Sequence, residues 1–277
     1  MSSSPLRIFI GSGEQSVLER KVLIYSLHKH TRRELDIRVF NGTHNAIERG
    51  NEAPSLAPLP LHLKYRSVTE FSLYRYLIPQ LCAFRGKALY LDSDTVCLSD
   101  IGKLFDHPLD NFDFLAKREA YSRGGEKMWG LSIMMIDCSR CRFDLEQIFT
   151  EIDRGIYTYS EFSQMGKNFL SSHPYEVGPI DPNWNVFDFC DSNTKLIHYT
   201  NLFTQPWKYC NHPYGHIWFS YLREAQHAGF ITDRDMKLAI LRGYVRPDLR
   251  EGNSPRPAGK IKARLRRWRS KPYSSHE

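Results

Sequence analysis

Short apolar runs alternate with stretches of helical periodicity over most of the chain, and this alternation constrains the fold more than any other feature. The run Leu6–Ile10 ends in a Gly-Ser-Gly turn, and apolar residues then recur at helical spacing over Glu14–Leu27. Two more runs follow, Ile37–Phe40 and Ala88–Leu91. Strands that alternate with helices need crossover connections, which place the strands parallel. We therefore expect an α/β fold with a doubly wound, mostly parallel, Rossmann-like sheet flanked by helices.

The rest of the chain continues the pattern. Further strands are predicted at Leu61–Tyr65, Phe112–Ala116, Leu131–Ile136 and Leu196–Tyr199. Helices are predicted at Phe71–Cys82, Phe143–Ile156, Ile217–Ala228 and Asp233–Tyr244. The segment Asn41–Pro60 is rich in Asn, Gly and Pro and is predicted to be a loop.

Length and composition exclude several classes of protein. The chain has 277 residues, of which 41% are hydrophobic, so it can build the core of one large domain. No apolar run approaches the ~18 residues of a membrane span, and the first residues lack the apolar region of a secretory signal. We expect a cytoplasmic protein whose six cysteines are free thiols. The pair Cys138 and Cys141 has the spacing of half a zinc site, but no second pair lies at a matching distance.

The net charge of +7 is confined to the C-terminus. Eight of the 38 basic residues and one of the 31 acidic residues fall within Ser254–Glu277, which leaves 30 of each in the preceding body. We therefore expect a domain over residues 1–253 and a basic tail over 254–277. Ile261, Leu265 and Trp268 recur among the arginines, so the tail is either a basic amphipathic helix that binds an anionic membrane surface or a disordered arm. A neutral body argues against nucleic-acid binding.

Asp92-Ser93-Asp94 directly follows an apolar strand. The carboxyl end of a strand is the edge at which open parallel sheets bind ligands. Two carboxylates at positions i and i+2 can reach one divalent cation, and that cation can hold a diphosphate. A solvated turn closed by a side-chain hydrogen bond would give the same pattern, so the motif alone leaves both interpretations open.

Four segments between Leu6 and Tyr209 resemble the family-eight glycosyltransferases, in the order in which that family carries them. The first three are Ser72-Leu-Tyr-Arg75, the string from Lys87 to Phe105 that contains Tyr90-Leu91-Asp92-Ser93-Asp94, and Asp181-Pro-Asn-Trp-Asn185. The fourth is Ile197-His-Tyr-Thr200 followed by Gln205-Pro-Trp207. The resemblance implies a GT-A-like fold and a metal-dependent, retaining transfer of a hexose from a nucleotide diphosphate sugar, with UDP as the expected nucleotide. The acceptor would be a glycan, a lipid or another molecule.

The resemblance also implies roles for individual residues. Asp92, Asp94 and His198 would bind Mn²⁺ or Mg²⁺, and a neutral imidazole with two carboxylates suits Mn²⁺. The residues expected to contact the donor are Ile10, Gly11, Ser12, Arg75, Asp92, Ser93 and Asp94. An oxygen beneath the anomeric carbon would come from Glu161 or Gln164, and the carboxylate of Glu161 is the stronger candidate because it stabilises a cation better than an amide does.

Two departures from the family pattern affect the predicted function. Gly130-Leu131-Ser132 stands where the family carries Asn-Ala-Gly to hold the donor sugar, and Gln205 replaces a lysine that would meet the diphosphate. These changes allow an alternative function, a degenerate relative that binds a nucleotide sugar or glycan without turnover. The presence of all three metal ligands favours the enzyme.

Overall fold

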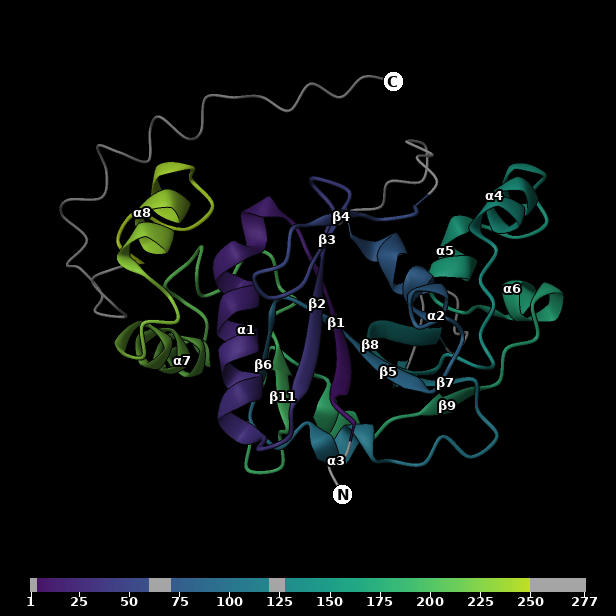
Figure 1. The fold of residues 1–277 in the computed structure, drawn as a ribbon, viewed down its shortest axis with the longest axis horizontal. Helices are drawn as coiled ribbons and strands as arrows, with labels where there is room; N and C mark the ends of the chain where they lie inside the picture. Colours follow the sequence, from purple (N-terminus) through teal and green to yellow (C-terminus); the bar gives the residue numbers. More distant parts are fainter. Residues whose placement is uncertain (1–3, 60–70, 120–127, 250–277) are drawn as a thin grey trace.

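The first elements build the parallel unit that the sequence predicts (Figure 1). The computed structural model describes residues 4–59, 71–119 and 128–249. The opening elements are β1 (Leu6–Ser12), the 3₁₀ turn η1 (Glu14–Ser16), α1 (Val17–His30) and β2 (Leu35–Asn41). β2 lies parallel to β1, with Leu6 opposite Leu35 and Ser12 opposite Asn41.

A mixed sheet of eight strands forms the centre of the described structure, in the order β4-β3-β2-β1-β5-β8-β7-β9. Its central strands β2, β1 and β5 are parallel, and β7 is parallel to β9. β8 is antiparallel to both β5 and β7, and β3 is antiparallel to β2 and β4. The additional strands are β3 (Ala46–Glu48), β4 (Ser55–Leu56), β5 (Lys87–Asp92), β7 (Phe114–Glu119), β8 (Met128–Asp137) and β9 (Val177–Pro179). The predicted α/β fold is therefore confirmed, with a parallel centre and antiparallel additions.

A second, three-stranded sheet lies beside the carboxyl end of β5. It consists of β6 (Thr95–Cys97), β10 (Val186–Phe187) and β11 (Leu196–His198), in the order β10-β11-β6. β6 begins three residues after β5 ends, and β11 pairs antiparallel with it, so that His198 lies opposite Thr95. The small sheet thus brings two distant parts of the sequence to one place.

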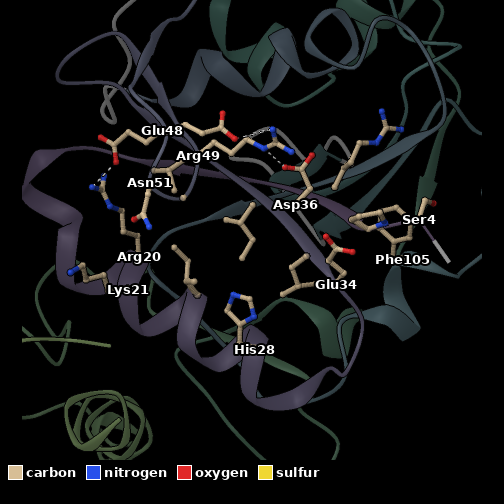
Figure 2. A pocket seen from close by; sticks show the side chains of 18 of the residues that line it. Ser4, Arg20, Lys21, His28, Glu34, Asp36, Glu48, Arg49, Asn51 and Phe105 are labelled. Carbon is tan, nitrogen blue, oxygen red and sulfur yellow. Dashed lines mark hydrogen bonds and ion pairs between the residues drawn. The ribbon is translucent and has the colours of Figure 1, made fainter. Parts of the chain in front are cut away.

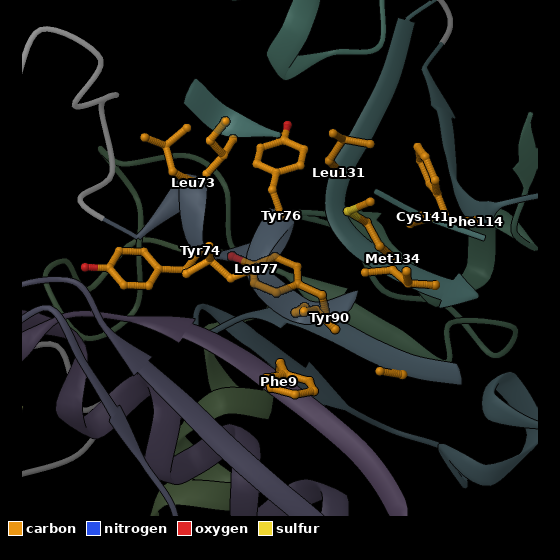
Figure 3. Packing of buried hydrophobic residues seen from close by; sticks show 14 of the residues in the cluster. Phe9, Leu73, Tyr74, Tyr76, Leu77, Tyr90, Phe114, Leu131, Met134 and Cys141 are labelled. Carbon is orange, nitrogen blue, oxygen red and sulfur yellow. The ribbon is translucent and has the colours of Figure 1, made fainter. Parts of the chain in front are cut away.

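Helices cover both faces of the central sheet (Figure 1). One group comprises α1, α7 (Gly215–His227) and α8 (Asp233–Leu241), and α1 packs Leu23 and Leu27 onto the sheet. The other group comprises η3 (Ser72–Leu77), α2 (Ile78–Leu81), α4 (Leu145–Asp153), α5 (Tyr159–Ser163) and α6 (Lys167–Ser172). Figure 3 shows the core beneath this second group, where Phe9, Tyr90 and Met134 of the sheet gather with side chains of η3. Two short elements, α3 (Gly102–Phe105) and η4 (Pro182–Trp184), lie in connections.

The predicted helix over Phe71–Cys82 is broken into two short pieces. Residues 72–77 form a 3₁₀ helix, and a single α-turn begins at Ile78. Pro79 explains the break, because proline has no N–H to donate to the Arg75 carbonyl that a continuous α-helix would present to it. Instead, the Ile78 N–H donates a hydrogen bond to the Arg75 carbonyl, three residues back, as in a 3₁₀ helix.

The predicted loop Asn41–Pro60 contains two short strands, so that prediction was wrong in part. β2 turns after Asn41-Gly42 and returns as β3, with Phe40 opposite Ile47. Asn41 pairs with Ala46, so the connection has four residues and ends at Asn45 with a positive φ of 48°, and the buried Ile47 packs the returning strand against the core. The polar composition of the segment obscured this hairpin.

Several other sequence predictions concern the same structure. All six cysteines are free, as predicted, and Cys82, Cys97, Cys138 and Cys141 are buried. Among the described helices, none has the length and apolarity that a bilayer span requires. The predicted strand at Leu61–Tyr65 and the basic tail 254–277 lie outside the described residues.

Candidate metal centre

The Asp92-Ser93-Asp94 turn lies at the carboxyl end of the parallel strands. β5 ends at Asp92, and the Ser93 N–H donates to the Gly11 carbonyl at 3.1 Å, which holds the turn against β1. Thr95 Oγ1 donates to the Asp92 carbonyl at 2.9 Å and closes the turn before β6. The motif is therefore a fixed connection between the two sheets.

His198 reaches the same turn from the end of β11. Ligand atoms of Asp92, Asp94 and His198 all lie within 4.8 Å of one another. His198 Nε2 is 2.9 Å from Asp94 Oδ1. Adjacent ligands of an octahedral ion with bonds of about 2.1 Å lie about 3 Å apart, so this spacing suits one divalent cation.

The donor atoms lack the partner that a cation would supply. Asn185 Oδ1 lies 3.0 Å from His198 Nδ1, and when it accepts the Nδ1 proton, the lone pair of Nε2 faces Asp94. Asp94 Oδ1 is buried, and apart from His198 Nε2 no described residue offers it a hydrogen-bond donor. A hydrogen bond that fixes the second imidazole nitrogen is typical of metal-binding histidines. The three residues therefore fit a divalent metal ion.

The surroundings are strongly acidic. Burial raises the pKa of Asp92, Arg75 opposes that rise, and the charge of Asp94 adds to it. Burial alone would lower the pKa of His198, but the carboxylates of Asp94 and Asp92 outweigh it and raise the pKa. Glu19 on α1 is also buried, and burial raises its pKa to about 8. A bound cation would offset the repulsion among these carboxyl groups.

Arg75 is buried and positions Asp92. Its Nη2 lies 3.4 Å from Asp92 Oδ1, and its Nη1 donates to the Leu131 carbonyl. Its guanidinium stacks over Tyr90 at 4.5 Å, and the Tyr90 hydroxyl donates to Asp92 Oδ1 at 2.6 Å. A contact of Arg75 with the donor remains a prediction, because in the structure its guanidinium meets Asp92 and β8.

Ile10, Gly11 and Ser12, which were predicted to contact the donor, form the end of β1 and direct no free polar side chain toward a ligand. Ile10 is buried in the core, and the Ser12 hydroxyl donates to the Gly13 carbonyl at 3.3 Å. A side chain at Gly11 would overlap the hydroxyl of Tyr90, so glycine is required where β1 meets the Asp92 support. The Gly11 carbonyl accepts from the Ser93 N–H and the Ser12 carbonyl accepts from the Gly42 N–H at 2.9 Å, so a donor contact of these three residues remains a prediction.

Known proteins share this arrangement of elements. No protein-family model matches the chain. Glycosyltransferase GlyB of Streptococcus pneumoniae is 22% identical over 181 residues, which are 58% of this chain and 44% of GlyB. The galactosyltransferase LgtC, solved with donor and acceptor sugar analogues, superposes with a TM-score of 0.57 and 14% identity over 79% of this chain and 96% of LgtC.

The bifunctional glycosyltransferase WbbM gives a TM-score of 0.58 and 17% identity over 85% of this chain and 51% of WbbM. The chain has a GT-A fold. It spans about half of the length of GlyB and of WbbM. The resemblance predicted from sequence is thus confirmed for the fold.

The two candidates for the catalytic oxygen differ in their surroundings within this GT-A fold. Glu161 Oε2 accepts from the Thr158 N–H at 2.9 Å and closes a capping box at the start of α5. Gln164 ends that helix, and its carbonyl accepts from the Trp129 N–H of β8 at 3.0 Å. Its side-chain Oε1 is buried with no hydrogen-bond donor among the described residues. Glu161 is thus engaged in a local capping box, whereas the Gln164 side-chain oxygen is buried without a donor among the described residues.

Some contributors to the site received no role from the sequence. Tyr90 could have been found, because it precedes Asp92 by two residues and side chains at i and i+2 share a strand face. Asn185 belongs to the motif Asp181-Pro-Asn-Trp-Asn185, but only the structure shows that its side chain contacts His198. Glu19 gave no signal, because its helix carries charged residues on several sides. Gln205 is buried and donates to the Tyr199 carbonyl at 3.1 Å, so its side-chain amide stabilises the loop after β11.

A pocket away from the candidate metal centre is shown in Figure 2. It has a volume of 1360 Å³ and lies between α1 and β2, with Arg20, Lys21 and His28 from the helix and Asp36 from the strand. Its charged side chains are largely paired, as Arg20 is with Glu48 at 2.9 Å. The pocket includes none of the candidate metal ligands.

We expect Asp94→Asn and His198→Ala to weaken Mn²⁺ binding by at least about 10-fold, because each removes one of three ligands. Electron paramagnetic resonance of free Mn²⁺ at increasing protein concentration would measure the affinity. Asp106→Asn, which removes an exposed carboxylate paired with Arg33, is the matched control. Equal Mn²⁺ affinity in all four proteins would contradict the metal site.

Proposed function

We propose that the chain is a metal-dependent, retaining glycosyltransferase that moves a hexose from a UDP sugar to a glycan or lipid-linked acceptor. The observation that carries the proposal is the convergence of Asp92, Asp94 and His198 at the carboxyl edge of a GT-A fold. Glycosyltransferases are the proteins that this fold resembles. Retention of configuration follows from the resemblance to the family-eight enzymes.

The residues of the candidate metal centre have two different roles. Asp92, Asp94 and His198 would hold Mn²⁺ or Mg²⁺, and a divalent cation supplies positive charge that stabilises a departing diphosphate. Tyr90 and Arg75 keep the Asp92 carboxylate in one orientation. Fixing the ligands before the donor arrives lowers the reorganisation that the reaction would otherwise need.

We further propose Gln164 as the oxygen beneath the anomeric carbon. Its buried Oε1 has no donor among the described residues, whereas Glu161 is occupied in its capping box. An active-site glutamine of LgtC has been replaced by glutamate in one solved structure, which supports a catalytic role for this residue type. An amide oxygen stabilises the developing positive charge less than a carboxylate does, but it is compatible with a nearby diphosphate.

The first test measures turnover. With Mn²⁺ and a panel of UDP sugars, the protein should release UDP when an acceptor is supplied, and a chelator should abolish both UDP binding and release, because bare carboxylates repel the diphosphate. Calorimetry gives the binding and a coupled assay gives the release. Metal-dependent binding without release for any donor would support the degenerate binding module instead. Equal UDP affinity with and without the chelator would contradict the metal-dependent function.

The second test separates the two candidate oxygens. Gln164→Ala should lower kcat by at least about 100-fold with donor affinity intact, as expected for loss of a transition-state contact. Glu161→Ala should leave kcat nearly unchanged but lower the stability by about 1 kcal/mol through the lost cap. Single-turnover kinetics and thermal unfolding of both variants decide between them. If Glu161→Ala alone lowers kcat, the assignment to Gln164 is wrong.

The basic tail 254–277, which lies outside the described residues, is proposed to bind anionic membrane surfaces. Its eight basic residues would each contribute about 1 kcal/mol of attraction close to anionic headgroups. Removing residues after Asn253 should abolish flotation with phosphatidylserine liposomes and leave turnover of a soluble acceptor unchanged. Flotation that persists in the shortened protein would place the membrane contact elsewhere.

A further inference from the structure

The ends of β7 and β8 form the wall of the site on the side away from the Rossmann-like strands. β5 and β7 are both antiparallel to β8, so the carboxyl end of β7 and the start of β8 lie at the same sheet edge as Asp92. The register shifts between Ala116 and Lys117, which pair with Met134 and Gly130. This bulge brings the last three residues of β7 against the first three of β8.

Lys117 joins this wall to the metal centre. Its Nζ donates to the Asn185 carbonyl at 2.7 Å and lies 3.6 Å from the centre of the Phe187 ring. Asn185 holds His198 through its side chain and also donates to Ser132 Oγ at 2.9 Å. The half-buried ammonium of Lys117 therefore contacts Asn185, which in turn contacts the candidate metal ligand His198. Only one of its three N–H groups is needed by the Asn185 carbonyl, so it can also donate to a bound molecule.

Glu119 covers the position at which the sugar-binding asparagine of the family is missing. A side chain at Gly130 would overlap Glu119 Oε1. The carboxylate of Glu119 therefore occupies the space that any residue larger than glycine would fill. Lys117 and Glu119 lie two apart on one strand, which places them on the same face. Burial lowers the pKa of Lys117, and the nearby Glu119 carboxylate raises it, which is consistent with their proximity.

The sheet order indicates which part of a donor meets this wall. In open α/β sheets ligands bind beyond the carboxyl ends of the strands, so the nucleotide would lie beyond the ends of the parallel strands β2, β1 and β5. The candidate metal centre at the end of β5 would hold the diphosphate. The group beyond the diphosphate then lies over β8 and β7, and in a nucleotide sugar that group is the sugar.

We propose that Lys117 and Glu119 are specificity-determining residues that bind hydroxyl groups of the transferred sugar and select an uncharged hexose over a uronic acid. The inference rests on the proposed function and adds the residues that would select an uncharged hexose. A hydroxyl both donates and accepts, so it can donate to Glu119 and accept from Lys117. A uronic acid would place a second carboxylate against Glu119, while the Lys117 ammonium already contacts the Asn185 carbonyl and the Phe187 ring. Like charges in a partly buried site repel strongly.

The test changes one charge at a time in the full chain. Calorimetry with Mn²⁺ compares UDP, UDP-glucose, UDP-galactose and UDP-glucuronic acid on the unmodified protein, Glu119→Gln and Lys117→Gln. Glu119→Gln should improve binding of UDP-glucuronic acid relative to the neutral sugars by at least about 10-fold. Without the Glu119 carboxylate, the positive charge of Lys117 can attract the carboxylate of the sugar. Lys117→Gln should weaken UDP-glucuronic acid most and the neutral sugars by about 10-fold. UDP itself should bind all three proteins alike.

Arg118 provides the matched control on the same strand. It is exposed and stacks over Trp129 at 5.1 Å, on the other face from Lys117 and Glu119. Arg118→Gln should therefore leave every affinity unchanged. If UDP binds normally and neither charge change alters the preference among sugars, this inference is wrong and the proposed function stands. If the unmodified protein binds no UDP with Mn²⁺, both are wrong. Thermal unfolding and Mn²⁺ affinity of Lys117→Gln exclude a loss caused by misfolding.

Discussion

The close approach of Asp94 and His198 joins the two sheets of the molecule. Asp94 belongs to the turn between β5 and β6, and His198 ends the strand that pairs with β6. An imidazole nitrogen at 2.9 Å from a carboxylate oxygen is stable only with a proton or a cation against both atoms. The buried strands on either side prevent the two groups from separating. The fold therefore holds the two groups at a distance that requires a proton or a cation between them, and a divalent ion would take the place of the proton.

The supports of Asp92 follow from the same constraint. A buried carboxylate beside a second one would protonate or move without partners that favour its charge. Tyr90 and Arg75 supply those partners from within the core, and Gly11 leaves room for the tyrosine hydroxyl. The tyrosine before the aspartates is thus needed for the site as well as for packing.

The sequence predicted those parts of the molecule in which local pattern and final environment agree. The buried strand that ends at Asp92 has the same periodicity in isolation as in the sheet, and the spacing of Asp92 and Asp94 predicted two of the candidate ligands. The third, His198, was predicted only through the resemblance to the family-eight glycosyltransferases. The 3₁₀ helix before Pro79 was missed because helical spacing cannot distinguish 3.0 from 3.6 residues per turn over so few residues. The roles of Asn185 and Glu19 depend on contacts between distant segments, for which one sequence carries no local signal. Glu161 was favoured on charge alone, and the capping box that engages it became evident only from the hydrogen bonds.

One departure from the family pattern, Gly130-Leu131-Ser132, lies at the bulge of β8, whereas Gln205 lies in the loop after β11. The parallel strands β2, β1 and β5 are covered by helices on both faces, so substitutions there would disturb two layers at once. β7 and β8 carry a bulge where the register shifts, and bulges reorient side chains with little effect on the rest of a sheet. Gly130 and Glu119 lie within this segment, and each accommodates the other because glycine leaves the space that the carboxylate fills. Under the proposed function, the parallel half of the sheet would hold the diphosphate, while the bulged half would contact the group that is transferred.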